Sequence, residues 1–337
     1  MKGKQVDMTK HDIIVIGASA GGVEALMELV RGLPPDLPAA VLIVLHVARR
    51  GTSIMPHILN REATLPARHP QSGERIEPGN IYLAPNDHHL LVKDGCIVLD
   101  AGPRENGFRP AVDSLFRTAA KAYGSRVVGV VLTGLLDNGS AGLVSVKANG
   151  GIAIVQDPAD AMFPDMPENA LKVVEADYVL PLAQIPTTLA RLAQTQVPQP
   201  VVSSGKGNPG DEADDTGTDN TIYTDEAGKK SDLVCPECGG SLVEYQGGKD
   251  DQLVSFRCRV GHRYSLHTLL ESQSRVTEAA LWAAVRSLEE NGSICRRMAQ
   301  QARASHQMST EEQYLARAED VRQHAEVIRR LLRGQRD

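Results

Sequence analysis

Three short segments of the chain carry side chains that together could perform acyl-transfer chemistry. Ser19 lies in the glycine-rich segment Gly17-Ala-Ser-Ala-Gly-Gly22, directly after the β-branched run Ile13–Ile16. His46 ends a second apolar run, and the pair Asp137-Asn138 follows a third. A hydroxyl, an imidazole and a carboxylate or amide are the groups of a serine hydrolase, in which a base activates the nucleophile and a third group orients the base.

Each of these segments also has a simpler interpretation when it is taken alone. Backbone amides at the start of a helix can bind a phosphate, so Gly17–Gly22 could belong to a nucleotide site, although it lacks both the G-x-G-x-x-G spacing and a Walker lysine. It could also be a turn that packs a helix against a strand. His46 could be a core histidine, and Asp137-Asn138-Gly139 could be an ordinary turn. The combination of all three favours the hydrolase.

The elements that would position these residues form an α/β pattern between residues 12 and about 192. Apolar, β-branched runs alternate there with segments of helical periodicity. The predicted strands are 13–16, 41–45, 81–84, 97–99, 126–132 and 152–156, and the predicted helices are 23–31, 112–123 and 142–149. This order predicts a three-layer, doubly wound fold with a mainly parallel sheet, in which functional groups gather at the carboxyl ends of strands.

The motifs in this part of the chain resemble the catalytic domain of the chemotaxis-type protein-glutamate methylesterases. The resemblance covers residues 12 to about 192. It rests on Gly17–Gly22, Leu45-His46, Ile81–Pro85 with Asp87 and His89, Arg109–Phe116, Leu132–Gly134, Gly139–Gly142, Gln156-Asp157 and Met166-Pro167. It implies hydrolysis of glutamate γ-methyl esters on a methylated chemoreceptor or similar signalling protein, with release of methanol. It also implies deamidation of receptor glutamine, and no cofactor for catalysis.

The resemblance assigns roles to individual residues. It places the nucleophile on Ser19 and the general base on His46. The backbone N–H that would stabilise the oxyanion falls near Leu135, and Ala20 and Met166 fall in the loops expected on the oxyanion and substrate side of the site.

This chain departs from the family pattern at the third catalytic position. The family's aspartate corresponds to Asn138, and an acid stands one residue earlier, at Asp137. An asparagine cannot stabilise an imidazolium electrostatically, and the same change in a serine protease lowers turnover about ten-thousandfold. Three outcomes therefore stay open: Asp137 takes over the role, the enzyme is slow, or the chain is a scaffold with an esterase fold. The receiver domain that usually precedes this catalytic domain is not expected, because only about ten residues precede the first strand.

The rest of the chain predicts a linker and a metal-binding module. With 10–195 as the catalytic domain, residues 196–230 are rich in proline, glycine, serine and acidic side chains and predict a flexible linker. Cys235-x2-Cys238 and Cys258-x3-His262 then have the spacing of a closed tetrahedral zinc site, so 231–266 is predicted to be a zinc-ribbon-like module. His267 could substitute for His262, and unmetallated thiols are the alternative.

Residues 267–337 are predicted to form a helical hairpin. Ser265 can cap a helix that runs to about Ala304, and a second helix is expected over 311–333. Its apolar residues recur in steps of four and three at Tyr314, Ala318, Val321, Ala325, Ile328 and Leu332. Such a stripe favours packing of the two helices on each other, with self-association or partner binding as the alternative.

Composition restricts the class of protein. A net charge of −6 argues against a general nucleic-acid binder, and no apolar run approaches the ~18 residues of a membrane span. The N-terminal residues lack the apolar core of a secretory signal. Five cysteines, three of them in the predicted metal site, are typical of reduced thiols. We therefore expect a cytoplasmic protein.

Overall fold

The computed structural model describes residues 8–46, 54–198, 228–247 and 253–333. Most of the predicted linker, residues 199–227, lies outside these ranges. The chain divides into two compact units, Met1–Leu269 and Leu270–Asp337. The domain boundaries expected from the sequence stay predictions.

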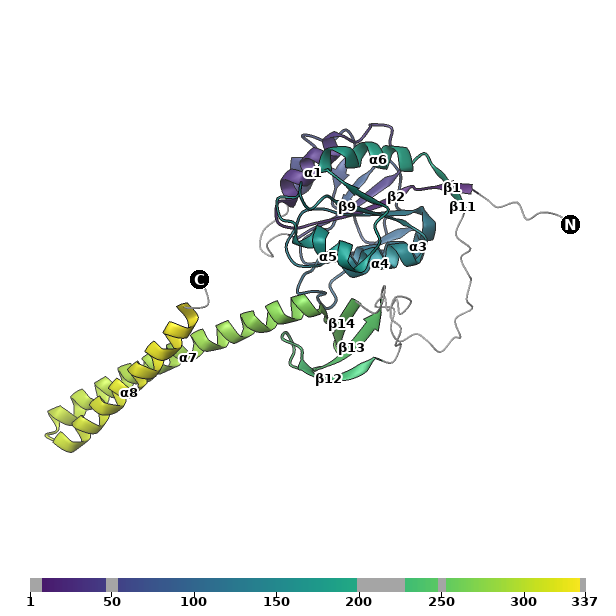
Figure 1. The fold of residues 1–337 in the computed structure, drawn as a ribbon. Helices are drawn as coiled ribbons and strands as arrows, with labels where there is room; N and C mark the ends of the chain where they lie inside the picture. Colours follow the sequence, from purple (N-terminus) through teal and green to yellow (C-terminus); the bar gives the residue numbers. More distant parts are fainter. Residues whose placement is uncertain (1–7, 47–53, 199–227, 248–252, 334–337) are drawn as a thin grey trace. The chain divides into compact units, whose positions relative to one another are not determined.

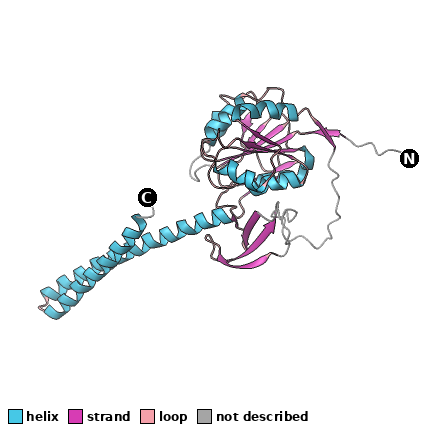
Figure 2. Cartoon of the chain, in the orientation of Figure 1, coloured by secondary structure: helices cyan, strands magenta, loops and turns pink. Residues whose placement is uncertain are grey.

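A seven-stranded parallel sheet with the order β10-β9-β8-β2-β3-β5-β4 forms the centre of the first unit (Figures 1 and 2). Its strands are β2 (Ile13–Ala18), β3 (Ala40–Leu45), β4 (Ala67–Arg68), β5 (Ile81–Leu83), β8 (Val127–Val131), β9 (Ile152–Gln156) and β10 (Tyr178–Leu180). The central strands β2, β3 and β8 are buried along their whole length, as expected of apolar runs without polar alternation.

Helices cover both faces of this sheet, which confirms the predicted three-layer fold (Figure 1). Among the described residues, the α-helices of this α/β part are α1 (Gly22–Arg31), α2 (Met55–Leu59), α3 (Val112–Tyr123), α4 (Ser140–Ala148), α5 (Asp165–Val173) and α6 (Ile185–Leu192). Alternate residues of a strand point to opposite faces of the sheet, so they pack into two different hydrophobic cores. Ile14 and Ile16 of β2 pack in the core that contains α1 and α6. Ile13 and Val15 pack in the core that contains α3, α4 and α5.

Several smaller elements surround the sheet. Two short 3-10 helices, Gly124–Arg126 and Leu182–Gln184, precede β8 and α6. Strand β1 (Met8–Lys10) pairs antiparallel with β11 (Gln196–Pro198). The predicted strand at 97–99 forms as β7 (Cys96–Asp100), but it pairs antiparallel with β6 (His89–Lys93) outside the main sheet.

A four-stranded antiparallel ribbon completes the first unit. Its strands are β12 (Lys229–Val234), β13 (Ser241–Gly247), β14 (Leu253–Cys258) and β15 (Arg263–Ser265). Its small core contains Leu242, Phe256 and Tyr264 together with two buried cysteines. So few apolar side chains make a weak core by themselves, which is typical of modules that a metal stabilises.

Two long helices form the C-terminal part, α7 (Leu266–Ala304) and α8 (Met308–Arg333). Ser265 caps α7 as predicted, because its hydroxyl accepts the N–H of Thr268 at 3.1 Å. Within the second unit, Gly292 of α7 lies against Val321 of α8, and Ala318, Ala325 and Leu332 of the predicted stripe are buried. None of the described helices is long and apolar enough to cross a membrane.

Candidate active site

Ser19 and His46 follow two neighbouring strands of the parallel sheet. Ala18 at the end of β2 pairs with Leu45 at the end of β3, and the N–H of His46 donates to the carbonyl of Ala18 at 3.1 Å. Each candidate residue is therefore the first residue after its strand. Two adjacent parallel strands thus bring a hydroxyl and an imidazole to the same sheet edge, as the sequence predicts.

The segment that follows β8 holds the turn that carries Ser19. The N–H of Ser19 donates to the carbonyl of Thr133 at 3.0 Å, and the hydroxyl of Thr133 donates to the carbonyl of Ala20 at 3.1 Å. A Cβ added at Gly134 would lie only 2.8 Å from the Cβ of Ser19. Glycine is therefore required where this segment passes Ser19, and Leu135, which is 47 % exposed, follows directly.

Met166 packs against the same segment and hydrogen-bonds to it. Its N–H donates to the carbonyl of Gly134 at 3.0 Å, and its side chain is fully buried. A Cβ at Gly134 would clash with the sulfur of Met166, so the two residues are in close contact. Asn169 adds a hydrogen bond of 2.8 Å to the carbonyl of Leu136. Met166 therefore underlies the segment near Ser19, while Ala20 belongs to the turn itself.

His46 is partly exposed as a whole residue, but both nitrogens of its ring are covered. Neither ring nitrogen has a hydrogen-bond partner among the described residues, and both are buried. Phe108 stacks on the ring, with centroids 3.9 Å apart and planes inclined by 5°. Burial lowers the pKa of His46 to about 3. The imidazole is therefore neutral at physiological pH, which is the state that a general base needs.

Asn138 is buried beside α3 and faces its first turn. Its Oδ1 accepts the backbone N–H of Val112 at 2.8 Å and that of Asp113 at 3.2 Å. Its Nδ2 is buried and has no partner among the described residues. The side chain thus caps a helix and makes no hydrogen bond to His46.

Asp137 points toward the ribbon. Its Oδ1 accepts the hydroxyl of Ser265 at 2.9 Å, and its Oδ2 lies 3.5 Å from Nδ1 of the exposed His267. Burial raises the pKa of Asp137, while Ser265 and His267 oppose that shift. The carboxylate next to Asn138 in the sequence therefore has its partners at the end of β15 and the start of α7, and it makes no hydrogen bond to the imidazole.

Residues that the sequence interpretation did not single out complete the site. Asp113 accepts the N–H groups of Gly139 and Gly142 at 2.9 and 2.7 Å, so it holds the loop that carries Asn138. Burial and the nearby charge of Glu105 raise the pKa of Asp113 to about 7. Asp113 lies inside Arg109–Phe116, one of the motifs that carry the resemblance, so the sequence contained a signal that could have identified it. Phe108 lies just outside that motif, and no sequence signal pointed to it.

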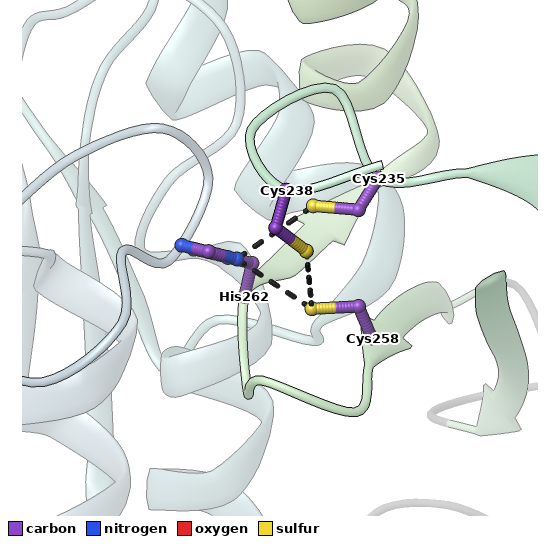
Figure 3. A group of neighbouring side chains, drawn as sticks. All are labelled: Cys235, Cys238, Cys258 and His262. Carbon is purple, nitrogen blue, oxygen red and sulfur yellow. Dashed lines mark hydrogen bonds between the residues drawn. The ribbon is translucent and has the colours of Figure 1, made fainter. Parts of the chain in front are cut away.

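The ribbon brings four candidate metal ligands together (Figure 3). The ligand atoms of Cys235, Cys238, Cys258 and His262 all lie within 4.8 Å of one another. The Sγ atoms of Cys238 and Cys258 are 3.7 Å apart, and Nδ1 of His262 lies 3.6 and 3.5 Å from the Sγ atoms of Cys235 and Cys258.

These separations fit a tetrahedral metal site. Thiolates about 2.3 Å from one zinc ion would stand about 3.7 Å apart at tetrahedral angles. A metal ion bound by these three sulfurs and one nitrogen would have no open coordination position, which is typical of structural zinc sites. His267 lies beside Asp137 and is not among the four grouped ligands.

Comparison with known proteins identifies the family of the α/β part of the chain. The family model described as CheB methylesterase matches residues 14–189. A solved structure, the CheB methylesterase catalytic domain of Thermotoga maritima, is 34% identical, with a TM-score of 0.52, and the match covers 54% of this chain and 98% of that chain.

Two curated relatives show how much of the chain the similarity includes. A protein of Leptospira interrogans, provisionally named protein-glutamate methylesterase/protein-glutamine glutaminase, is 37% identical over 56% of this chain and 98% of the relative. The protein-glutamate methylesterase/protein-glutamine glutaminase of Thiobacillus denitrificans is 40% identical over 53% of this chain, and this chain matches only about half of that relative (51%). Because the family model matches residues 14–189, about half of the chain, and the Leptospira relative is 37% identical and matched over 98% of its length, this chain belongs to the CheB methylesterase family.

Proposed function

We propose that this chain hydrolyses glutamate γ-methyl esters on a methylated chemoreceptor or similar signalling protein, releasing methanol, with glutamine deamidation as a second activity. The observation that carries the proposal is the pairing of β2 with β3, which sets Ser19 and His46 side by side at the carboxyl edge of the sheet. The names of its relatives, protein-glutamate methylesterase/protein-glutamine glutaminase, support the same two reactions.

In the proposed mechanism, His46 removes the proton from the Ser19 hydroxyl as its oxygen attacks the ester carbonyl. The oxyanion forms beside the segment that follows Thr133, where the backbone N–H of Leu135 is the donor. His46 then returns the proton to the departing methoxide, so methanol leaves and an acyl-serine remains. Water, deprotonated by His46, then attacks this ester; the bond to the Ser19 oxygen breaks, His46 returns the proton to that oxygen, and glutamate is released. With glutamine, the leaving group is ammonia.

Because Asn138 stands where the family has an aspartate, we expect this mechanism to be slower in this chain. The imidazolium formed in each step normally has a carboxylate partner, and the Oδ1 of Asn138 is occupied by the N-terminus of α3. The neutral form of His46 is favoured by its burial, so the barrier lies in forming its charged state.

The absence of a carboxylate at Asn138 also supports a second candidate function, that of a signalling scaffold with an esterase fold. A serine-directed organophosphorus probe separates the two candidates, because it reacts only with an activated hydroxyl. The hydrolase predicts labelling of the full chain at Ser19, located by peptide mass spectrometry, and loss of labelling in both Ser19→Ala and His46→Ala. Absence of labelling in the wild type, together with absence of methanol release, would favour the scaffold.

The Cys235, Cys238, Cys258 and His262 cluster would hold a structural zinc ion. Its four protein ligands and tetrahedral separations support this, and zinc would supply folding free energy to the ribbon, with no step in catalysis. The five cysteines without disulfides suit the cytoplasm. Self-association through the C-terminal helices stays a prediction.

A further inference from the structure

The last strand of the ribbon pairs with a segment beside the candidate active site. The N–H of Asn106 donates to the carbonyl of Arg263 at 2.7 Å, and the N–H of Arg263 donates to the carbonyl of Arg104 at 3.2 Å. Glu105 and Arg263 form a parallel bridge. All of these residues belong to the first compact unit. The segment therefore covers an edge of the ribbon sheet whose backbone groups would otherwise lack partners.

The paired segment continues into a two-residue hairpin. Glu105 and Phe108 exchange both backbone hydrogen bonds, at 3.1 and 3.0 Å. Between them, Asn106 and Gly107 both have positive φ values, of 54° and 75°. This is the Asn-Gly arrangement that favours a tight, well-defined turn. Movement of Asn106 would therefore carry Phe108 with it.

The side chain of Asn106 connects the ribbon to the catalytic loop. Its Oδ1 accepts the N–H of Ser265 and the hydroxyl of Thr268, both at 2.8 Å. Its Nδ2 donates to Asp113 at 2.9 Å, and Asp113 in turn holds the N–H of Gly139, next to Asn138. The residue is 95 % buried, since only 5 % of it is exposed. A buried amide with partners on both sides fixes their relative position.

Phe108, at the other end of the hairpin, makes the stacking contact with His46. In a serine hydrolase, the third catalytic residue normally orients the imidazole through a hydrogen bond. No described residue hydrogen-bonds to the ring nitrogens of His46, and the oxygen of Asn138 caps α3. The plane of the imidazole therefore depends on the parallel stack with Phe108.

We propose that Phe108 is a positioning residue for His46, and that the ribbon strand Arg263–Ser265 fixes Phe108 through Asn106. The ribbon is in this way a structural part of the active site. This inference rests on the proposed function, in which His46 is the general base.

The kinetic test compares two substitutions of Phe108 in the full chain. Phe108→Leu removes the aromatic ring and is expected to lower kcat for methanol release at least about tenfold, with KM nearly unchanged, because a misplaced base slows the chemical step. Phe108→Tyr keeps the ring and is expected to stay within about threefold of wild type. Phe116→Leu is the matched control. It is the same phenylalanine-to-leucine substitution, made at a fully buried core residue that does not stack on His46. Its Tm should fall while kcat stays within about threefold.

The test of the ribbon uses Asn106→Gly. Glycine keeps the positive φ of the turn and removes the bonds to Ser265, Thr268 and Asp113. We expect kcat to fall by about the same factor as in Phe108→Leu. Wild-type kcat in Asn106→Gly would overturn the role of the ribbon, and wild-type kcat in Phe108→Leu would overturn the role of Phe108.

A readout that does not need activity separates this inference from the proposed function. NMR titration of isotope-labelled histidine follows the His46 ring, identified by its loss in His46→Gln. The pKa of His46 should rise from about 3 toward that of a free imidazole in both Phe108→Leu and Asn106→Gly, because water reaches the ring. An inactive wild type with these shifts would contradict the hydrolase and support the positioning. An active wild type without them would contradict the positioning alone.

Discussion

The Oδ1 atom of Asn138 accepts the backbone N–H of Val112 at 2.8 Å. Val112 is the first residue of α3, so the amide oxygen caps that helix and only Nδ2 remains for other partners. An amide nitrogen donates hydrogen bonds and cannot stabilise a positive imidazolium. At the position where the resemblance predicts the third catalytic residue, the chain therefore has an uncharged amide whose oxygen is bound to α3.

Replacing Asn138 with aspartate should increase turnover. A carboxylate caps a helix as well as an asparagine does, so the fold should tolerate the change. We expect Asn138→Asp to raise kcat by between about tenfold and ten-thousandfold. The new negative charge favours the imidazolium, so the pKa of His46 rises from about 3 and the acid limb of kcat/KM moves to higher pH. A pH profile of methanol release checks both effects, and an unchanged profile with unchanged kcat would contradict them.

Asp137→Asn should change turnover little. The carboxylate of Asp137 accepts the hydroxyl of Ser265, and an amide oxygen at the same place can accept it too. We expect kcat within about threefold of wild type. A loss of about a hundredfold or more would mean that Asp137 supplies the charge that His46 needs, contrary to the observed hydrogen bonds.

The sequence predicted the positions of Ser19 and His46 well, because each directly follows a buried strand whose apolar run is unmistakable. Parallel pairing of β2 and β3 then leaves almost no freedom in where these two residues lie. The seven-stranded sheet was likewise predictable in class. Strand β4 was not, because its two residues carry no periodicity.

The contacts of Asp137 and Phe108 could not be predicted from the sequence. Both depend on residues more than 50 positions away, since Ser265 binds Asp137 across 128 positions and Phe108 stacks on His46. No local pattern encodes such a pairing. The Asn106-Gly107 dipeptide was a turn signal, but its link to Ser265 spans 159 positions and follows only from the docking of the ribbon.

Arg117→Met should strongly destabilise the first unit. Arg117 forms two hydrogen bonds of 2.9 Å with the carboxylate of Glu105, and both side chains are largely buried. Removing the guanidinium leaves the buried carboxylate with only the Ser114 hydroxyl and the more distant charge of Arg263, so the free energy of unfolding should fall by up to about 3–5 kcal/mol. Thermal or urea unfolding of the full chain would measure this loss, and Glu105→Gln combined with Arg117→Met should recover part of it.

The same pair predicts a pH dependence. Burial alone would raise the pKa of Glu105, but the charge of Arg117 holds it well below its usual range. A depressed folded-state pKa contributes stability above the unfolded pKa of about 4.3, and this contribution is lost as the pH falls. The difference in Tm between wild type and Arg117→Met should therefore be largest near neutral pH and shrink below about pH 4. A difference that grows in acid would contradict this assignment.

Elemental analysis should find one zinc ion per chain. Cys238→Ala removes one of the four grouped ligands, so the affinity for zinc should fall at least about tenfold. Cys295→Ala is the matched control, because Cys295 is a free cysteine of α7 outside the cluster, and it should retain the metal. Purified protein without zinc, or a loss of zinc in Cys295→Ala alone, would contradict a site at Cys235, Cys238, Cys258 and His262.

The most direct test of the account is methanol release from a methylated receptor fragment by the full chain. Wild type should release methanol with multiple turnovers, while Ser19→Ala and His46→Ala should reduce the rate to background without changing Tm by more than a few degrees. Combining the two substitutions should lower the rate little further, because the pair acts as a unit. Methanol release by Ser19→Ala at the wild-type rate would contradict Ser19 as the nucleophile, and its absence in both wild type and Asn138→Asp would contradict the esterase itself.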